Sequence, residues 1–154
     1  VVPRDGDWSP LTRQVVLEDL SLWDPPKEAV EAAAALTDLK ILSFGDYFAA
    51  DLTAFSGMSG LEALNLHKGS LESLEGVESL SRLISLSVGF NRVTDLSPLV
   101  GLDQLNYIQL EDLPIDDFSP LMELPSLGYL VVPQAQAEAV KADCPGYTFE
   151  LRTY

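Results

Sequence analysis

The sequence predicts an α/β solenoid, in which short parallel strands line one side of a coil and short helical turns line the other. Three observations predict it. The pattern L-x-x-L-x-L recurs six times at a strict spacing of 22 residues. The centre of each occurrence alternates apolar and other residues with the period of two that is typical of a strand. The second half of each unit carries apolar residues at steps of three, which suits 3₁₀ turns.

The six occurrences share one register, so their strands recur once per coil. Such strands pair in parallel, about 4.8 Å apart. A full unit presents seven inward apolar positions, which one unit could not bury alone and which stacking against neighbouring units would bury. The pattern starts at Leu17, Leu39, Leu61, Leu83, Leu105 and Leu127.

The connecting limbs carry their own start signals. Residues 27–36 follow two prolines and are rich in alanine, which predicts an α-helix. Ser97 and Ser119 each precede a proline. These pairs predict short helices with serine at the N-cap and proline at the first helical position.

An interrupted row of acids, Asp51, Asp95 and Asp117, recurs just before the return limbs. A carboxylate in this place can accept backbone N–H groups at the start of the limb. Calcium binding is the alternative, since Ca²⁺ prefers oxygen ligands. Ser73 occupies the same register position in the coil between the first two, and serine caps as well as aspartate but is a poor calcium ligand. We therefore predict caps and no metal site.

The two ends of the chain differ from the repeats, as the caps of a solenoid must. We expect residues 1–154 to form a single domain. Within it, residues 1–16 form an N-terminal cap in which Trp8 shields the first coil. Residues 17–132 form the repeats, and residues 133–154 form a C-terminal cap.

The C-terminal cap combines a helix with a last strand. Residues 135–142 predict the helix, and Cys144 is expected to be buried, as free cysteines usually are. Tyr147, Phe149 and Leu151 alternate as an edge strand. Self-association through this edge strand is a possible mode of oligomerisation.

The repeats resemble the leucine-rich repeat family, most closely its 22-residue, internalin-like bacterial class. The best match is residues 83–102, LISLSVGFNRVTDLSPLVGL. The resemblance covers about residues 17–132 and implies a right-handed coil with the sheet on the concave face and 3₁₀ or short helices on the convex face. The family usually places asparagine eight residues after each start, where its amide ties adjacent coils together. Only Asn91 conforms here, so the asparagine ladder of the family is absent.

The resemblance makes the concave face readable, because strand residues alternate between core and surface. Its middle is small and polar, its C-terminal half carries tyrosines, and acids lie on the adjoining loops. Tyrosine supplies much contact area at low entropy cost, while acids steer a basic partner. The alternative is that the aromatic residues pack on neighbouring coils. The candidate partner-binding residues are Tyr47, Asn65, His67, Ser87, Phe90, Arg92, Tyr107, Gln109, Glu111, Asp112 and Tyr129.

Catalytic and metal chemistry find little support in the sequence. His67 is the one histidine, and we expect Asp46 to be its nearest acid. A general base would need an oriented carboxylate within hydrogen-bond reach. Cys144 has no second cysteine or nearby histidine with which to form a metal or nucleophile pair. We predict that the protein is not an enzyme and has no catalytic residues, metal or cofactor.

The charge narrows the classes of partner. The chain has 9 basic and 24 acidic residues and a net charge of −15, which argues against nucleic acid and against an anionic membrane surface. The sequence predicts a non-catalytic protein-interaction module, with charge favouring a basic partner. Two alternatives stay open: an immunity-type protein that neutralises a basic toxin, and a fragment of a bacterial surface adhesin. No signal peptide or anchor motif is recognisable, which favours a cytoplasmic location.

Overall fold

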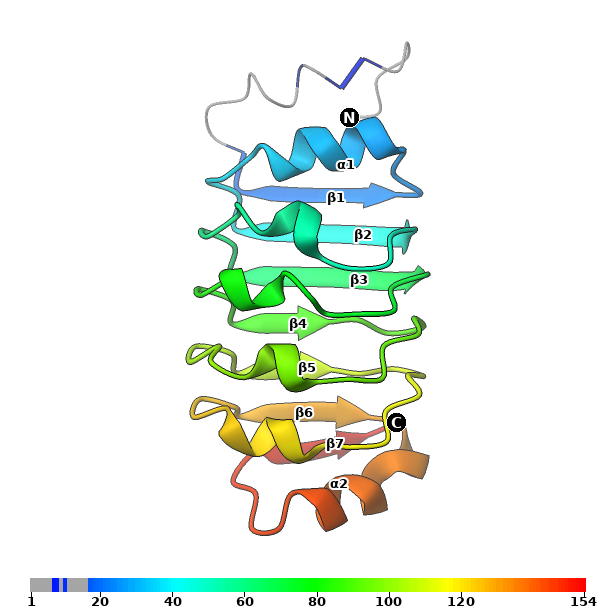
Figure 1. Ribbon diagram of the computed structural model, residues 1–154, viewed down its shortest axis with the longest axis vertical. Coiled ribbons are helices and arrows are strands. Elements are labelled where there is room, and N and C mark those ends of the chain that lie inside the picture. Colours follow the sequence, from blue (N-terminus) through cyan, green and yellow to red (C-terminus); the bar gives the residue numbers. More distant parts are fainter. Residues whose placement is uncertain (1–6, 9, 11–16) are drawn as a thin grey trace.

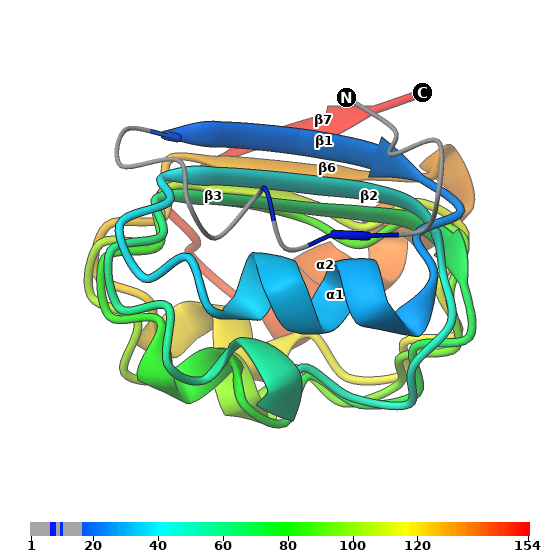
Figure 2. The same ribbon diagram turned by 90° about the horizontal axis from the view of Figure 1, so that it is seen from above.

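The computed structural model describes residues 7, 8, 10 and 17–154, and in these the chain winds into a solenoid. Seven parallel strands form one sheet in sequence order, from β1 at one end of the stack to β7 at the other (Figure 1). Viewed along the stack, the coils superpose, with the sheet on one side and the helices and 3₁₀ turns on the other (Figure 2). The predicted α/β solenoid is therefore confirmed.

The strands and the connecting elements alternate along the chain. The strands are β1 (Asp19–Trp23), β2 (Ile41–Tyr47), β3 (Ala63–Gly69), β4 (Ser85–Ser87), β5 (Tyr107–Gln109), β6 (Tyr129–Val132) and β7 (Glu150–Thr153). The α-helices are α1 (Lys27–Ala34) and α2 (Ala137–Asp143). The 3₁₀ helices are η2 (Thr53–Phe55), η3 (Val77–Ser79), η4 (Ser97–Leu99), η5 (Ser119–Glu123) and η6 (Gln134–Gln136).

The pairing register follows the 22-residue spacing from β1 to β6. Leu20 pairs with Leu42 and Leu42 with Leu64, and all of these side chains point into the core. The last step is one residue shorter, because Leu130 pairs with Leu151. Full burial of one such leucine stabilises the fold by about 1.5–3 kcal/mol, so the regular leucine column is the main reason that the coils stack.

The first five coils share an unusual backbone conformation, which lies within the strand in β2 and β3 and after the strand in the other three. One residue per coil has a positive φ although it is not glycine, with φ between 48° and 57°. Aspartate tolerates this left-handed conformation better than most residues do, and three of the five are aspartates. The five are Asp24, Asp46, Lys68, Phe90 and Asp112.

The side chain of Asn91 forms hydrogen bonds with the backbone of two neighbouring coils. Its Nδ2 donates to the carbonyls of Leu66, Val88 and Gly89 at 3.0, 3.3 and 3.1 Å. Its Oδ1 accepts the N–H of Leu71 at 3.2 Å. The side chain is buried, so one amide satisfies backbone groups that water cannot reach. This is the role that the family resemblance implies for asparagine in this register.

The predicted capping of the return limbs by the acidic row is confirmed. The separate prediction that Ser97 and Ser119 are the N-caps of η4 and η5 is wrong. Ser97 and Ser119 are the first residues of these helices and not their N-caps. The carboxylate two residues earlier takes the capping role, because each return limb needs an acceptor for the N–H of its first residue. The N–H of Thr53 donates to Asp51 Oδ1 at 3.0 Å, that of Glu75 to Ser73 Oγ at 3.0 Å, that of Ser97 to Asp95 Oδ1 at 2.8 Å and that of Ser119 to Asp117 Oδ1 at 2.8 Å.

These caps predict a defined response to acid. Side-chain and backbone hydrogen bonds lower the pKa of Asp51, Asp95 and Asp117 in the fold. A lowered folded pKa gives stability that is present above the unfolded value and lost as the pH falls below about 4. A triple Asp→Asn variant keeps the acceptor oxygens without the charge. It should therefore show less acid destabilisation than the wild type when urea midpoints are compared at neutral and acidic pH. Parallel losses in both proteins would contradict the prediction.

The C-terminal cap differs from its predicted outline. The helix predicted for residues 135–142 is present as η6 followed by α2. The predicted strand begins too early, because β7 starts only at Glu150. Gly146 has a φ of 75° and turns the chain before Tyr147, whose ring stacks on Phe149 at 4.7 Å. The two aromatic residues therefore precede the strand and cover the last coil.

Two further predictions concern the ends. Cys144 is fully buried, as predicted, and its thiol donates to the carbonyl of Phe118 at 3.2 Å. Burial raises the pKa of this thiol, which disfavours the reactive thiolate. The predicted N-terminal cap lies outside the described residues except for Asp7, Trp8 and Pro10, of which Trp8 is buried.

Candidate functional site

The side of the sheet opposite the core, here called the open face, corresponds to the predicted concave face. The strand pairing arranges its side chains in rows across the coils, as the sequence predicts. One row contains Asp19, Ile41, Ala63, Ser85, Tyr107, Tyr129 and Glu150. The next contains Ser21, Ser43, Asn65, Ser87, Gln109, Val131 and Arg152. A third begins with Trp23, Gly45 and His67.

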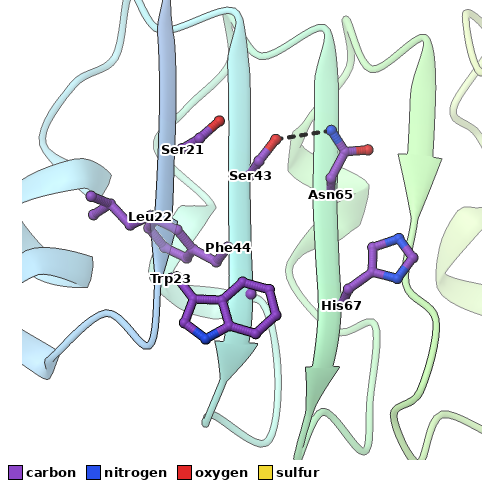
Figure 3. Close-up of a pocket in the computed structure, with 8 residues that line it drawn as sticks. Ser21, Leu22, Trp23, Ser43, Phe44, Asn65 and His67 are labelled. Carbon is purple, nitrogen blue, oxygen red and sulfur yellow. Dashed lines mark hydrogen bonds between the residues drawn. The ribbon is translucent and has the colours of Figure 1, made fainter.

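Trp23 lies across the neighbouring strand at the position of Gly45. A Cβ atom built on Gly45 would stand 2.2 Å from Cε3 of the indole, so only glycine fits beneath the ring. Figure 3 shows the ring spread over β2, with His67 on the far side of a shallow hollow. The hollow has a volume of about 470 Å³ and is lined by residues of β1, β2 and β3. Trp23 remains 68% exposed.

The same large-over-small arrangement recurs two coils further along. Gly89 lies between His67 and Glu111, and a Cβ atom on it would stand 2.7 Å from Glu111 Cβ and 3.2 Å from His67 Cε1. Large side chains therefore alternate with glycines along this row. The two glycines let their large neighbours lean across the sheet.

His67 is held by groups from two other coils. Its Nε2 lies 2.7 Å from Ser87 Oγ, and its Nδ1 lies 3.7 Å from Glu111 Oε2. The expectation that Asp46 would be the nearest acid is wrong. Glu111 comes closer because Gly89, between them, has no side chain to block it.

Further hydrogen bonds extend this cluster along β5. Gln109 donates to Glu111 Oε1, and the Tyr107 hydroxyl donates to Gln109 Oε1 at 3.0 Å. We call the five residues Ser87, His67, Glu111, Gln109 and Tyr107 the His67 network. All five are predicted site residues, and the structure brings them together on the open face. Their mutual bonds fix the side chains before any partner arrives, which lowers the entropy cost of binding.

Ser87, His67 and Glu111 follow the order of a catalytic triad, in which a histidine base lies between a serine nucleophile and a carboxylate. In such a triad the base is within about 3.2 Å of both neighbours. The 3.7 Å between His67 Nδ1 and Glu111 Oε2 exceeds that range. Ser87 is only 4% exposed, so a substrate would not reach its hydroxyl. The geometry suits a positioned recognition surface better than nucleophilic attack.

Tyr47 is wrongly predicted as a surface contact. It is 2% exposed and packs against the rings of Phe44 and Phe55, with centroids 6.0 and 5.5 Å away. The left-handed backbone at Asp46 breaks the alternation of β2 and turns the next side chain into the core. Burial raises the pKa of Tyr47 to about 12. Ser87 is also unsuited to direct contact, because His67 covers it.

The remaining predicted residues are spread over the open face and its loops. Asn65 donates to Ser43 Oγ at 3.0 Å. Phe90 is 42% exposed and Tyr129 is 37% exposed. Arg92 and Asp112 are exposed on the loops, where Arg92 Nη1 lies 3.7 Å from Glu72 Oε1.

Two functional candidates of the open face were absent from the predicted set. The repeat register placed Trp23 on this face. The signal that its ring lies flat was Gly45, which occupies the same register position in the next coil. Arg152 places its guanidinium 4.7 Å from the centroid of the Tyr129 ring. The last coil is one residue short, so the 22-residue register could not place Arg152 beside Val131.

Other kinds of site are not visible in the described part of the chain. Among residues 7, 8, 10 and 17–154, no group of three or more His, Cys, Asp or Glu side chains is arranged to hold a metal ion. In the same residues, no helix is both long and apolar enough to cross a membrane.

Comparison with solved structures identifies the fold. The chain is similar to internalin C2 from Listeria monocytogenes, with a TM-score of 0.67 and 27% identity over 94% of this chain. The chain is a leucine-rich repeat protein. A second internalin from the same species, inlF, matches with a TM-score of 0.59 over 88% of this chain. Its 17% identity makes that likeness one of fold alone.

Sequence comparison adds a partial match to a human protein. Over 62 residues, or 40% of its length, this leucine-rich repeat protein is 36% identical to human leucine-rich repeat-containing protein 56. No family model matches the chain. The chain spans 66% of internalin C2, 47% of inlF and 11% of the human protein. Solenoids of this internalin-like fold typically bind proteins and are usually non-catalytic.

Proposed function

We propose that this leucine-rich repeat protein is a non-catalytic interaction module that binds a protein partner through the open face of its sheet and the adjoining loops. The observation that carries the proposal is the set of exposed aromatic side chains on the open face of the parallel sheet. Trp23 and Tyr129 are 68% and 37% exposed, whereas other aromatic rings, those of Phe44 and Phe55, are buried in the core. Aromatic residues of this kind dominate the energetics of protein interfaces.

The electrostatics of the chain favour a basic partner. With a net charge of −15, the protein attracts cationic surfaces and accelerates their encounter. Two narrower forms of the proposal follow. The charge supports an immunity-type protein that neutralises a basic toxin, and the likeness to internalins supports a fragment of a bacterial surface adhesin. The cytoplasmic location and the self-association through β7 remain predictions.

A matched pair of double variants tests the binding face. Once a partner has been captured from native lysate and purified, its affinity is measured for Tyr107→Ala/Tyr129→Ala and for Val100→Ala/Met122→Ala. The tyrosines lie on the open face, whereas Val100 and Met122 are exposed on the opposite side. The first variant should bind at least about tenfold more weakly, and the second should bind as the wild type does. Equal affinities for all three proteins would contradict the proposed face.

A further inference from the structure

We propose that the exposed ring of Trp23 receives an arginine side chain of the partner, an inference that rests on the proposed function and specifies the partner's chemistry. The site is the hollow between Trp23 and His67, over β1, β2 and β3 (Figure 3). Arginine is the occupant that the geometry, the acceptor groups and the charge of this hollow favour.

The geometry of Trp23 is that of a prepared stacking platform. The sheet supports one side of the indole, because Gly45 brings the backbone of β2 directly beneath the ring. The other side faces outward, and the residue is 68% exposed. A flat, supported ring offers its π face without further rearrangement. Tryptophan is the side chain that attracts a cation most strongly through this face.

The molecule already uses this interaction at the opposite end of the open face. The Arg152 guanidinium lies 4.7 Å from the centroid of the Tyr129 ring, and Glu150 Oε1 accepts from Arg152 Nε at 2.8 Å. Tyr129 thus carries a guanidinium supplied by the chain itself. Trp23 has no such cation among residues 7, 8, 10 and 17–154.

The lining of the hollow offers acceptors for guanidinium N–H groups. Ser21, Ser43 and Asn65 form a row beside Trp23 (Figure 3). The Asn65 amide nitrogen donates to Ser43 Oγ, and this orientation leaves the Asn65 carbonyl oxygen as an acceptor. A guanidinium has five donors and no acceptor, so it complements a rim of hydroxyl and carbonyl oxygens.

The charge around the hollow selects a cation. Asp24 directly follows Trp23 on the adjoining loop, and Asp46 directly follows Gly45 within β2. Lys27 pairs with Glu31 at 3.3 Å and Lys40 with Glu18 at 2.8 Å. Of the lysines in the first three coils this leaves Lys68, which follows His67, against the two aspartates. Arginine is favoured over lysine because a planar guanidinium stacks flat on an indole and keeps its N–H groups free for neighbouring oxygens.

The test uses two synthetic Gly-Ser peptides of equal length, blocked at both ends, with three arginines in one and three lysines in the other. They are titrated into the ¹⁵N-labelled protein and followed by NMR. The arginine peptide should shift the indole N–H signal of Trp23 and bind about fivefold more tightly than the lysine peptide. Trp23→Ala should abolish this preference, while Trp23→Phe should retain part of it.

Phe48→Ala is the matched control. Phe48 is 70% exposed, much like Trp23, but it lies beyond the end of β2 and away from the hollow. This variant should keep the arginine preference. Equal binding of the two peptides by the wild type, a preference that survives in Trp23→Ala, or no binding of the arginine peptide up to about 5 mM would each overturn the proposal.

The same variants separate this proposal from the broader one. With a purified partner, a loss of affinity in both Trp23→Ala and Tyr107→Ala/Tyr129→Ala supports both. An affinity that is lost in the tyrosine variant but unchanged in Trp23→Ala would overturn the arginine site and leave the proposed function standing.

Discussion

Replacing Asn91 by alanine is expected to lower the free energy of unfolding by about 3 kcal/mol or more. The substitution leaves the buried N–H of Leu71 without its acceptor and removes a donor from each of the carbonyls of Leu66, Val88 and Gly89. Truncating one partner of a buried hydrogen bond costs the desolvation of the group left behind. Four backbone groups are affected at once.

Urea denaturation measures this loss, with Asn106→Ala as the control. The Asn106 amide makes one hydrogen bond, to the carbonyl of Ser126 at 2.7 Å, in an exposed setting. Its removal should cost less than about 1 kcal/mol, because water replaces the donor. If both substitutions lower the free energy of unfolding equally, the Asn91 hydrogen bonds between the coils do not contribute to stability as described.

Gly76→Ala is expected to have the second large effect, again about 3 kcal/mol or more. Two causes combine at this position. Gly76 has a φ of 101°, which an L-residue with a side chain adopts only under strain. A Cβ atom there would also stand 2.6 Å from Leu52 C and Thr53 N in the preceding coil. Backbone atoms cannot give way as the end of a flexible side chain can, so the two coils would have to move apart.

Two other glycines separate these causes. Gly101 has a φ of 94°, but a Cβ atom on it would meet nothing within 4 Å, and Gly57 has open space without a positive φ. Gly101→Ala should therefore cost about 1 kcal/mol from strain alone, while Gly57→Ala should be nearly neutral. Thermal or urea unfolding of the three variants gives the comparison. A loss in Gly101→Ala as large as that in Gly76→Ala would mean that contact between coils is not the cause.

The repeat made the fold predictable in detail. A strict spacing of apolar residues determines which side chains face inward and which strands pair, because each coil can bury its leucines only against its neighbours. The caps at Asp51, Asp95 and Asp117 were predictable for the same reason. Ser73 occupies the same register position in another coil, and because serine can cap but is a poor calcium ligand, this position was predicted to be a cap. The late start of β7 was not predictable, since the turn at Gly146 and the stacking of Tyr147 on Phe149 lie outside the repeat.

The candidate site was predictable as a face but not as a set of contacts. The register placed His67, Glu111 and Trp23 in one row. It could not show that Glu111 leans across Gly89 towards His67, since that depends on side-chain directions. Tyr47 was misplaced because the prediction put it on an exposed loop after the strand, whereas it is the last residue of β2 and the left-handed backbone at Asp46 turns its side chain into the core.

The alternation of Trp23, Gly45, His67, Gly89 and Glu111 has a consequence for changing the length of the protein. The backbone repeats every 22 residues, but the large-and-small row repeats only every second coil. Insertion or deletion of one coil within this row would keep the core in phase and yet set two bulky side chains, or two glycines, side by side. A pair of coils is therefore the smallest unit that can be added or removed without disturbing the alternation of large and small side chains on the open face.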